Sequence, residues 1–161
     1  MIIIIMGVSG AGKTTIGKLL ADSLDWQFSD ADAFHSLENI EKMGRGIALS
    51  EADRIPWLED LQTAIKNWLQ ENKNVVLACS ALKESYRQFL VVDSDRIKLV
   101  YLKGSYELIQ KRLQERHNHY MSEKLLNSQF ITLEEPLDTL YIDVIETPQV
   151  IVQNIRTALG I

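Results

Sequence analysis

Apolar residues in this chain follow two alternating patterns. Apolar, strand-like runs occur at residues 1–6, 26–29, 74–79, 97–102 and 141–145, and the first of them is continuous, which is typical of a buried parallel strand. Between these runs apolar residues recur three or four positions apart, as at Ile16 and Leu20, which is helical spacing. Strands that alternate with helices predict an α/β fold, in which a five-stranded parallel sheet is covered by helices on both faces.

The longest interval between predicted strands covers residues 37–72. We expect a short helix over Leu37–Met43, then a turn, then a long helix that begins after Ser50. Ser50 and Asp53 resemble a capping box, with Asp in place of the usual Glu, which marks where the long helix begins. The sequence shows no repeat and no linker rich in Pro, Gly or Ser, so we expect a single domain over residues 1–161 with this interval as a helical insertion.

A phosphate-binding motif follows the first predicted strand, because residues 7–14 have the spacing G-x-x-x-x-G-K-[ST] of the P-loop. Its glycines let several backbone N–H groups turn towards one anion, its lysine reaches the β- and γ-phosphates, and its threonine hydroxyl is a Mg²⁺ ligand. A chance match is the alternative, but the strand before the motif and the helix after it favour a nucleoside triphosphate site. The residues expected to hold ATP are Gly7, Ser9, Gly10, Ala11, Gly12, Lys13, Thr14 and Thr15.

Two acidic residues follow the second predicted strand. Asp30 and Asp32 lie two positions apart, so in an extended chain their side chains project from the same face and can converge on one site. We expect Asp30 to lie nearer a Mg²⁺ ion beside the P-loop and Asp32 nearer an acceptor molecule. A turn or a helix N-cap is the alternative, because Asp serves in both. The third strand ends at Cys79 without the acid that helps to hold Mg²⁺ in many P-loop proteins, which shifts that duty towards the acid pair.

Basic residues outside the P-loop are candidates for binding an anionic acceptor. Arg54 lies in the first turn of the expected long helix, where its charge opposes the helix dipole, and this favours an anion-binding role over a solvated surface charge. Lys83 and Arg87 are four residues apart on the next helix and so share a face, which either binds a substrate carboxylate or phosphate or is solvated. A locally basic stretch leads into residues 117–136, which predict either a mobile lid over the triphosphate or a plain charged helix pair.

The overall charge argues against some partners. The formal net charge of −5 gives no general support for binding to nucleic acid or to a membrane surface. No apolar run approaches the roughly 20 residues of a membrane span, and the opening run is too short for the apolar core of a signal peptide. The single cysteine rules out an internal disulfide and fits a reducing compartment. We therefore expect a cytoplasmic protein that acts on a small molecule.

Further segments carry a more specific signal. They are Cys79-Ser80-Ala81-Leu82-Lys83, with Tyr86-Arg87, and Ser128-Gln129-Phe130, with Leu133-Glu134-Glu135-Pro136. Together with the P-loop and the acid pair, these segments resemble the gluconokinases, small P-loop kinases that phosphorylate D-gluconate to 6-phospho-D-gluconate with ATP. The resemblance covers nearly the whole chain. It implies a three-layer P-loop kinase fold with a helical substrate-binding insertion and a short helical lid, ATP with Mg²⁺ as phosphoryl donor, and a homodimer.

The resemblance also implies roles for individual residues. Those implied to be catalytic are Lys13, Asp32 and Arg54. Those implied to hold Mg²⁺ are Thr14 and Asp30, and those implied to lie in the lid near adenine and the phosphates are Arg112 and Arg116. The residues implied to surround gluconate are Asp32, His35, Arg54, Lys83, Arg87 and Gln129.

Some positions depart from the family pattern. Ala48 stands where the family usually has Pro, and Glu51 and Ala52 stand where it often has acids, so Ala52 is the clearer loss. These positions lie on turns and caps, so the departures bear on local geometry and substrate affinity and not on the class of reaction.

Two other functions compete with this interpretation. One is a kinase for shikimate or a nucleoside monophosphate, against which the segment 79–83 and Arg54 argue. The other is a nucleotide-gated binding module that has lost catalysis, against which the intact Lys13, Asp30 and Asp32 argue.

Overall fold

Five parallel strands and the helices between them make up the computed structural model, which describes residues 1–115 and 123–161. The strands are β1 (Ile2–Met6), β2 (Gln27–Asp30), β3 (Val75–Ala78), β4 (Ile97–Lys103) and β5 (Leu140–Asp143). The helices are α1 (Lys13–Leu24), the 3-10 helix η1 (Ala31–Phe34), α2 (Leu37–Gly44), α3 (Glu51–Gln70), α4 (Glu84–Leu90), α5 (Tyr106–Glu115), α6 (Glu123–Thr132) and α7 (Pro148–Leu159). The expected strands are confirmed, with ends that differ by one or two residues. Among the helices that the structure describes, none has the length and apolar character needed to cross a membrane.

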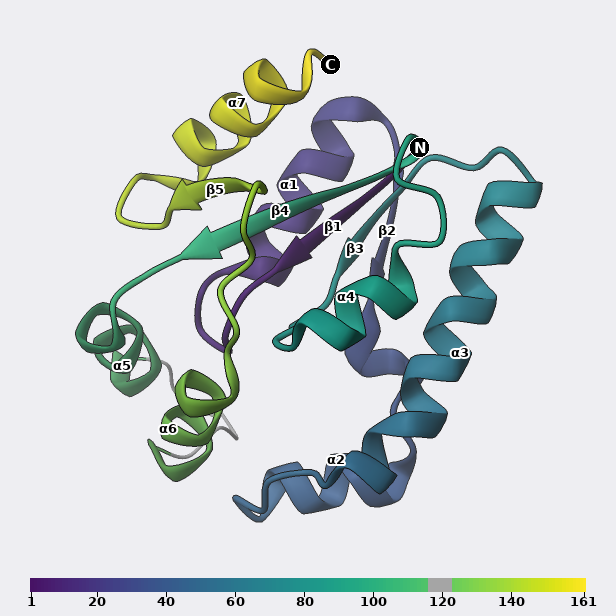
Figure 1. Cartoon of the computed structure of the whole chain (residues 1–161). Helices are drawn as coiled ribbons and strands as arrows, with labels where there is room; N and C mark the ends of the chain where they lie inside the picture. The colour runs from purple at the N-terminus through teal and green to yellow at the C-terminus, as the bar shows by residue number, and fades with distance from the viewer. Residues whose placement is uncertain (116–122) are drawn as a thin grey trace.

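The sheet has the strand order β2-β3-β1-β4-β5, and every neighbouring pair is parallel. β1 lies at its centre and is buried on both faces, which explains its continuous apolar sequence. Ile2 and Ile4 pack with α3 and α4, whereas Ile3 and Ile5 pack with α1 and α7. Helices therefore cover both faces of the sheet, as Figure 1 shows, and the predicted three-layer α/β fold is confirmed.

The register of the strands brings three chain segments to one edge of the sheet. Asp30 pairs with Ala78, and Ala78 pairs with Ile5, so β2, β3 and β1 end side by side. The backbone N–H of Gly7 donates to the carbonyl of Ser80 and so joins two of the loops that follow these strands. Ligands of parallel α/β sheets bind at this carboxyl edge, so the register places the loops where a site is expected.

The P-loop turns sharply between β1 and α1. Gly10 and Gly12 have φ values of 84° and 99°, in the left-handed region that a side chain disfavours. A Cβ atom on Gly10 would also lie 3.0 Å from the Leu113 side chain of α5. Both glycines are therefore needed for the curvature of the loop, and Gly10 is also needed for the close approach of α5.

The helical insertion expected at residues 37–72 consists of α2 and α3. The Ser50 hydroxyl accepts from the Asp53 N–H, and the Asp53 carboxylate accepts from the Ser50 N–H, so the predicted capping box is confirmed. The indole N–H of Trp57 donates to the Ala31 carbonyl at 2.8 Å and ties α3 to η1. In Figure 1, α2 and α6 lie beyond the ends towards which the strands point, one at each side of the carboxyl edge.

The local structure of the acid pair differs from the expectation. Asp32 does not continue β2 in an extended conformation but lies in η1, where Asp30 is the N-cap and its Oδ1 accepts from the Asp32 N–H at 2.9 Å. The short Asp side chain can bond the backbone two residues ahead, and this local bond competes with an extended strand. The N-cap alternative is therefore realised.

Candidate active site

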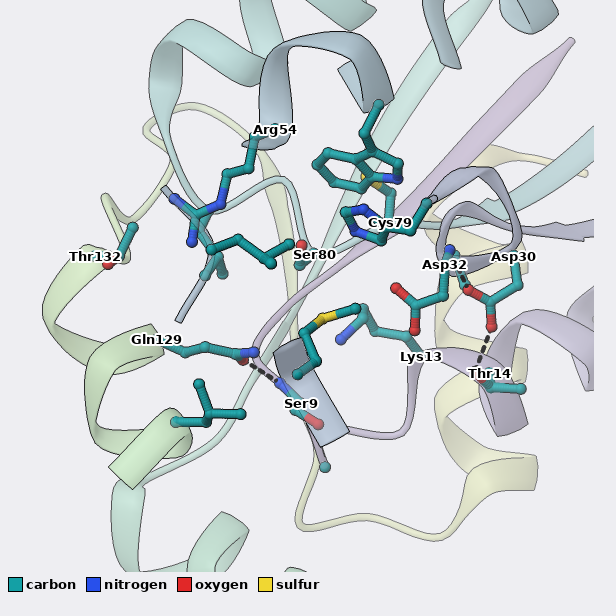
Figure 2. Close-up of a pocket in the computed structure, with 18 of the residues that line it drawn as sticks. Ser9, Lys13, Thr14, Asp30, Asp32, Arg54, Cys79, Ser80, Gln129 and Thr132 are labelled. Carbon is teal, nitrogen blue, oxygen red and sulfur yellow. Dashed lines mark hydrogen bonds between the residues drawn. The ribbon is translucent and has the colours of Figure 1, made fainter. Parts of the chain in front are cut away.

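A cavity of about 520 Å³ opens at the carboxyl edge of the sheet, between the P-loop, η1, the start of α3, the loop after β3, and α6 (Figure 2). It brings together most of the residues predicted from the sequence, namely Ser9, Gly10, Gly12, Lys13, Thr14, Thr15, Asp30, Asp32, His35, Arg54 and Gln129. Among the described residues, those predicted for the site that do not line this cavity are Gly7, Ala11, Lys83, Arg87 and Arg112. Arg116 lies outside the described residues.

One end of the cavity is suited to phosphate and a metal ion. The Lys13 ammonium donates to the carbonyls of Gly7 and Val8 at 2.9 and 3.0 Å, so it is held over the loop beside the N-terminus of α1. The Thr14 hydroxyl donates to Asp30 Oδ2 at 3.0 Å. Hydroxyl and carboxylate oxygens are ligands that Mg²⁺ prefers. Among the described residues no group of three His, Cys, Asp or Glu is gathered for a metal, so an ion here would complete its shell with phosphate and water.

Asp32 has the properties of a proton acceptor. Desolvation by the surrounding protein, and then the neighbouring Asp30 carboxylate, raise its pKa above the ordinary value for aspartate, while the Lys13 ammonium acts in the opposite direction. A raised pKa makes a carboxylate a stronger base. Figure 2 shows Asp32 between Asp30 and Lys13, next to the phosphate-binding end.

His35 is held as a neutral imidazole with a defined tautomer. Its ring stacks on Trp57, with centroids 4.4 Å apart and planes 9° apart. The amide nitrogen of buried Asn39 donates to the Asp53 carbonyl at 2.9 Å and lies 3.3 Å from His35 Nδ1. Because a carbonyl only accepts, that atom of Asn39 is the NH₂ group, so Nδ1 accepts and Nε2 carries the proton. Burial, and then the Arg54 charge, lower the pKa of His35 to about 4.

A second group of polar side chains lies at the far end of the cavity, around Arg54. Its guanidinium donates to the Tyr86 hydroxyl at 3.2 Å, and that hydroxyl donates to Glu51 Oε1 at 2.8 Å. The Lys83 ammonium donates to the same oxygen of Glu51. Sequence reasoning missed Asn39 and Tyr86 as site residues, although Tyr86 lies in a segment that carries the family resemblance.

Arg87 does not face the cavity, contrary to the expectation for a residue that binds the acceptor. It is 4% exposed, and its guanidinium donates to the carbonyls of Ala81 and Glu134 at 2.8 and 2.7 Å and pairs with Glu84 at 3.0 Å. The expected shared face with Lys83 is wrong, because α4 begins only at Glu84 and Lys83 is its N-cap residue. Arg87 therefore supports the wall of the cavity from behind.

The segment expected to form a lid contacts the P-loop directly. The Ser9 N–H donates to Gln129 Oε1 at 2.7 Å, so α6 bonds to the backbone of the loop, as Figure 2 shows. Arg112 lies on α5 and its guanidinium donates to the Val144 carbonyl, in the loop after β5. Residues 117–122 of the expected lid lie outside the described residues.

Cys79 forms part of the cavity wall where β3 ends. It is 1% exposed, and burial raises the pKa of its thiol to about 12. Cys79 is therefore a small buried residue of the wall.

Comparison with known proteins agrees with this architecture. The sequence profile of the shikimate kinase family matches residues 9–157. A gluconokinase from Arabidopsis thaliana is 44% identical, over 96% of this chain and 89% of that protein. Among solved structures, a sugar kinase from a Janibacter species has a TM-score of 0.92 at 39% identity, covering 99% of this chain and 94% of that one. A gluconokinase from Sinorhizobium meliloti has a TM-score of 0.87 at 38% identity, covering 98% and 90%. With these levels of identity over nearly all of its length, the chain belongs to the gluconokinase family of small P-loop kinases.

Proposed function

We propose that this protein transfers the γ-phosphoryl group of ATP to the 6-hydroxyl of D-gluconate and releases 6-phospho-D-gluconate and ADP. The observation that carries this proposal is a single cavity with the P-loop and Asp32 at one end and Arg54 at the other (Figure 2). A sugar acid has a hydroxyl at one end and a carboxylate at the other, so it matches the two ends of the cavity. Membership of the gluconokinase family supports the same substrate.

The phosphate end supplies the charge that the transfer needs. The P-loop N–H groups and Lys13 would bind the phosphates and neutralise the negative charge that shifts towards the leaving group. Mg²⁺ bound by Thr14 and Asp30 would supply further positive charge to the β- and γ-phosphates. The 6-hydroxyl oxygen forms a bond to the γ-phosphorus, the bond from that phosphorus to the β–γ bridging oxygen breaks, and the hydroxyl proton passes to Asp32.

The acceptor end would fix the orientation of gluconate. Arg54 and Lys83 would pair with its carboxylate, and the fork of Arg54 would favour the planar carboxylate over a neutral hydroxyl group. His35, with its proton on Nε2, would donate to a hydroxyl of the sugar chain. Gln129 would hold α6 against the P-loop, so that water is excluded from the γ-phosphate.

An acceptor panel tests this proposal. ADP release would be measured with gluconate, shikimate, AMP and the neutral polyol glucitol, and the product identified by phosphorus NMR. We expect turnover with gluconate and a phosphate ester at its 6-position. Faster turnover with shikimate or AMP would assign the chain to another kinase class. Tightly bound nucleotide without turnover on any acceptor would favour a nucleotide-gated binding module.

The single-domain organisation, the homodimer and the cytoplasmic location stay predictions. Sedimentation of the purified protein, which measures its mass in solution, tests the homodimer directly.

A further inference from the structure

Three donors at the rim of the cavity converge on one carboxylate oxygen. The Lys83 ammonium and the Tyr86 hydroxyl both donate to Glu51 Oε1, the latter at 2.8 Å. Arg54 Nη1 lies 3.9 Å from the same oxygen and donates to the Tyr86 hydroxyl at 3.2 Å. The cluster joins the start of α3 to the start of α4. A carboxylate of the protein thus holds the donors that suit the carboxylate of a substrate.

The two sides of this cluster face different surroundings. Arg54 and Tyr86 line the cavity, and the Arg54 side chain is 20% exposed. Glu51 is 56% exposed and does not line the cavity. Hydrogen bonds from Lys83 and then Tyr86 hold the pKa of Glu51 below its ordinary value. Glu51 is therefore a charged group that an acceptor meets when it reaches these donors from inside the cavity.

Glu51 can leave these donors without disturbing the start of α3. The capping box of this helix consists of Ser50 and Asp53, whose reciprocal bonds of 2.9 and 3.2 Å do not involve the Glu51 side chain. Exposed ion pairs contribute little to stability, because water competes for both partners. Displacement of the Glu51 carboxylate therefore needs only a side-chain rotation at the protein surface.

We propose that Glu51 is an internal competitor for the substrate carboxylate and so lowers the affinity of the site for gluconate. This inference rests on the proposed function. The carboxylate of gluconate would take over the donors of Glu51, and the two negative charges would repel each other until Glu51 moves outward. An acceptor without a carboxylate cannot replace the Glu51 carboxylate at these donors, and it forms no ion pair with Arg54 or Lys83. Glu51 thus weakens the binding of gluconate. Ligands that bind Arg54 and Lys83 more weakly than gluconate does cannot displace the Glu51 carboxylate.

Substitution of Glu51 tests the inference, with Glu59→Gln as the matched control. Glu59 is exposed on the same helix about two turns further along, so its substitution removes the same charge from α3 away from the cluster. In Glu51→Gln and Glu51→Ala we expect the KM for gluconate to fall about two- to fivefold, which corresponds to about 0.4–1 kcal/mol. The Kd of gluconate from calorimetry without nucleotide should fall likewise. The kcat and the KM for ATP should stay as in the wild type.

The outcomes separate this inference from the proposed function. An unchanged or raised KM for gluconate in both Glu51 variants, with a wild type active on gluconate, would overturn the inference alone and assign Glu51 to positioning Lys83 and Tyr86. An equal fall in KM in Glu59→Gln would also overturn it, because the effect would then belong to net charge. A wild type inactive on gluconate would overturn the proposed function, and the inference with it.

Discussion

The character of Asp32 as a base comes from its surroundings. Desolvation and the nearby Asp30 carboxylate both raise its pKa, and Lys13 limits the rise. Both carboxylates line the cavity, but only Asp30 is engaged by the Thr14 hydroxyl. This difference supports the proposal that Asp30 binds the metal ion and Asp32 receives the proton of the acceptor.

Asp32→Asn should therefore reduce kcat by roughly 10²–10⁴-fold, because the amide cannot accept the proton of the 6-hydroxyl. Nucleotide binding should change little, as measured by calorimetry with a non-hydrolysable ATP analogue. Asp30→Asn is the control and should weaken binding of the Mg²⁺–nucleotide complex. Near-normal turnover in Asp32→Asn would remove this residue from the role of base.

His35 should make the stability of the protein depend on pH. The unfolded histidine binds a proton below its ordinary pKa of 6.5, whereas the native one does so only near pH 4, so the unfolded state binds more protons between these values. The free energy of unfolding should thus fall as the pH is lowered from 6.5 towards 4, by about 1–2 kcal/mol after allowance for solvent screening at this partly exposed ring. Urea unfolding at pH 7 and at pH 5 measures this change in the free energy of unfolding. His35→Gln should lack this component, and an identical pH dependence in the variant would contradict the prediction.

The site residues that sequence predicts are those whose chemistry requires a residue type at a fixed spacing. The P-loop and the pair of Asp30 and Asp32 belong to this group, because backbone curvature and metal ligation leave few alternatives. Asn39 acts through a carbonyl 14 residues away and a ring 4 residues away, a combination that appears only when α2, α3 and η1 have packed together. Arg87 was assigned wrongly because its main partners are backbone carbonyls, which any sequence supplies.

The carboxyl-edge loop after β3 and the segment after α6 are joined through α4. The Arg87 guanidinium bonds both of them, and the Glu134 N–H also donates to the Leu82 carbonyl at 2.8 Å. Since Leu82 and Ser80 line the cavity, this junction fixes one wall of the acceptor site. It also anchors the end of α6, whose Gln129 contacts the P-loop.

Arg87→Met should lower the free energy of unfolding by about 2–4 kcal/mol, because the buried carbonyl of Ala81 and the partly buried carbonyl bond of Glu134 lose a charged donor. The KM for gluconate should rise more than the KM for ATP, since the acceptor wall loosens. Arg87→Lys should recover only part of both effects, because lysine has no fork that reaches two carbonyls. Urea unfolding and steady-state kinetics measure these changes.

Arg45→Met provides the control for the Arg87 variants. Arg45 pairs with Glu41 on the surface and its side chain is 68% exposed, so its loss should change stability by less than about 0.5 kcal/mol. Equal destabilisation by the two methionine variants would show that the buried contacts of Arg87 do not hold the wall.

The sheet and its two covering layers follow from apolar periodicity, and this is why the fold could be predicted. The central strands are short apolar runs between helices of regular spacing, and parallel strands joined by helices leave few arrangements. The apolar periodicity did not predict η1, because this helix depends on a local hydrogen bond of the Asp30 side chain. It did not predict the strand order β2-β3-β1-β4-β5 either, because that order depends on pairing between segments far apart in the sequence. The cavity arises from this order, since it brings the ends of β1, β2 and β3 together.

Binding of nucleotide should stabilise the entire fold, because the P-loop connects the central strand to α1. At a ligand concentration 100 times its Kd, a non-hydrolysable ATP analogue with Mg²⁺ should add about 2.7 kcal/mol, or roughly 5–10 °C in Tm for a chain of this length. Lys13→Ala should lose most of this shift at the same ligand concentration, as measured by thermal unfolding. An equal shift in both proteins would mean that the nucleotide binds elsewhere.

The reaction of Cys79 with a thiol reagent reports how often the cavity wall opens. It is the only cysteine in the sequence, it lies in the cavity wall, and burial keeps its thiol protonated with a pKa of about 12. A thiol reagent needs both access and a thiolate, so it should modify Cys79 only while the end of β3 is open to water. The rate of alkylation then measures how often the cavity wall separates. Its slowing by bound ligands would give the free energy of closure without any introduced label.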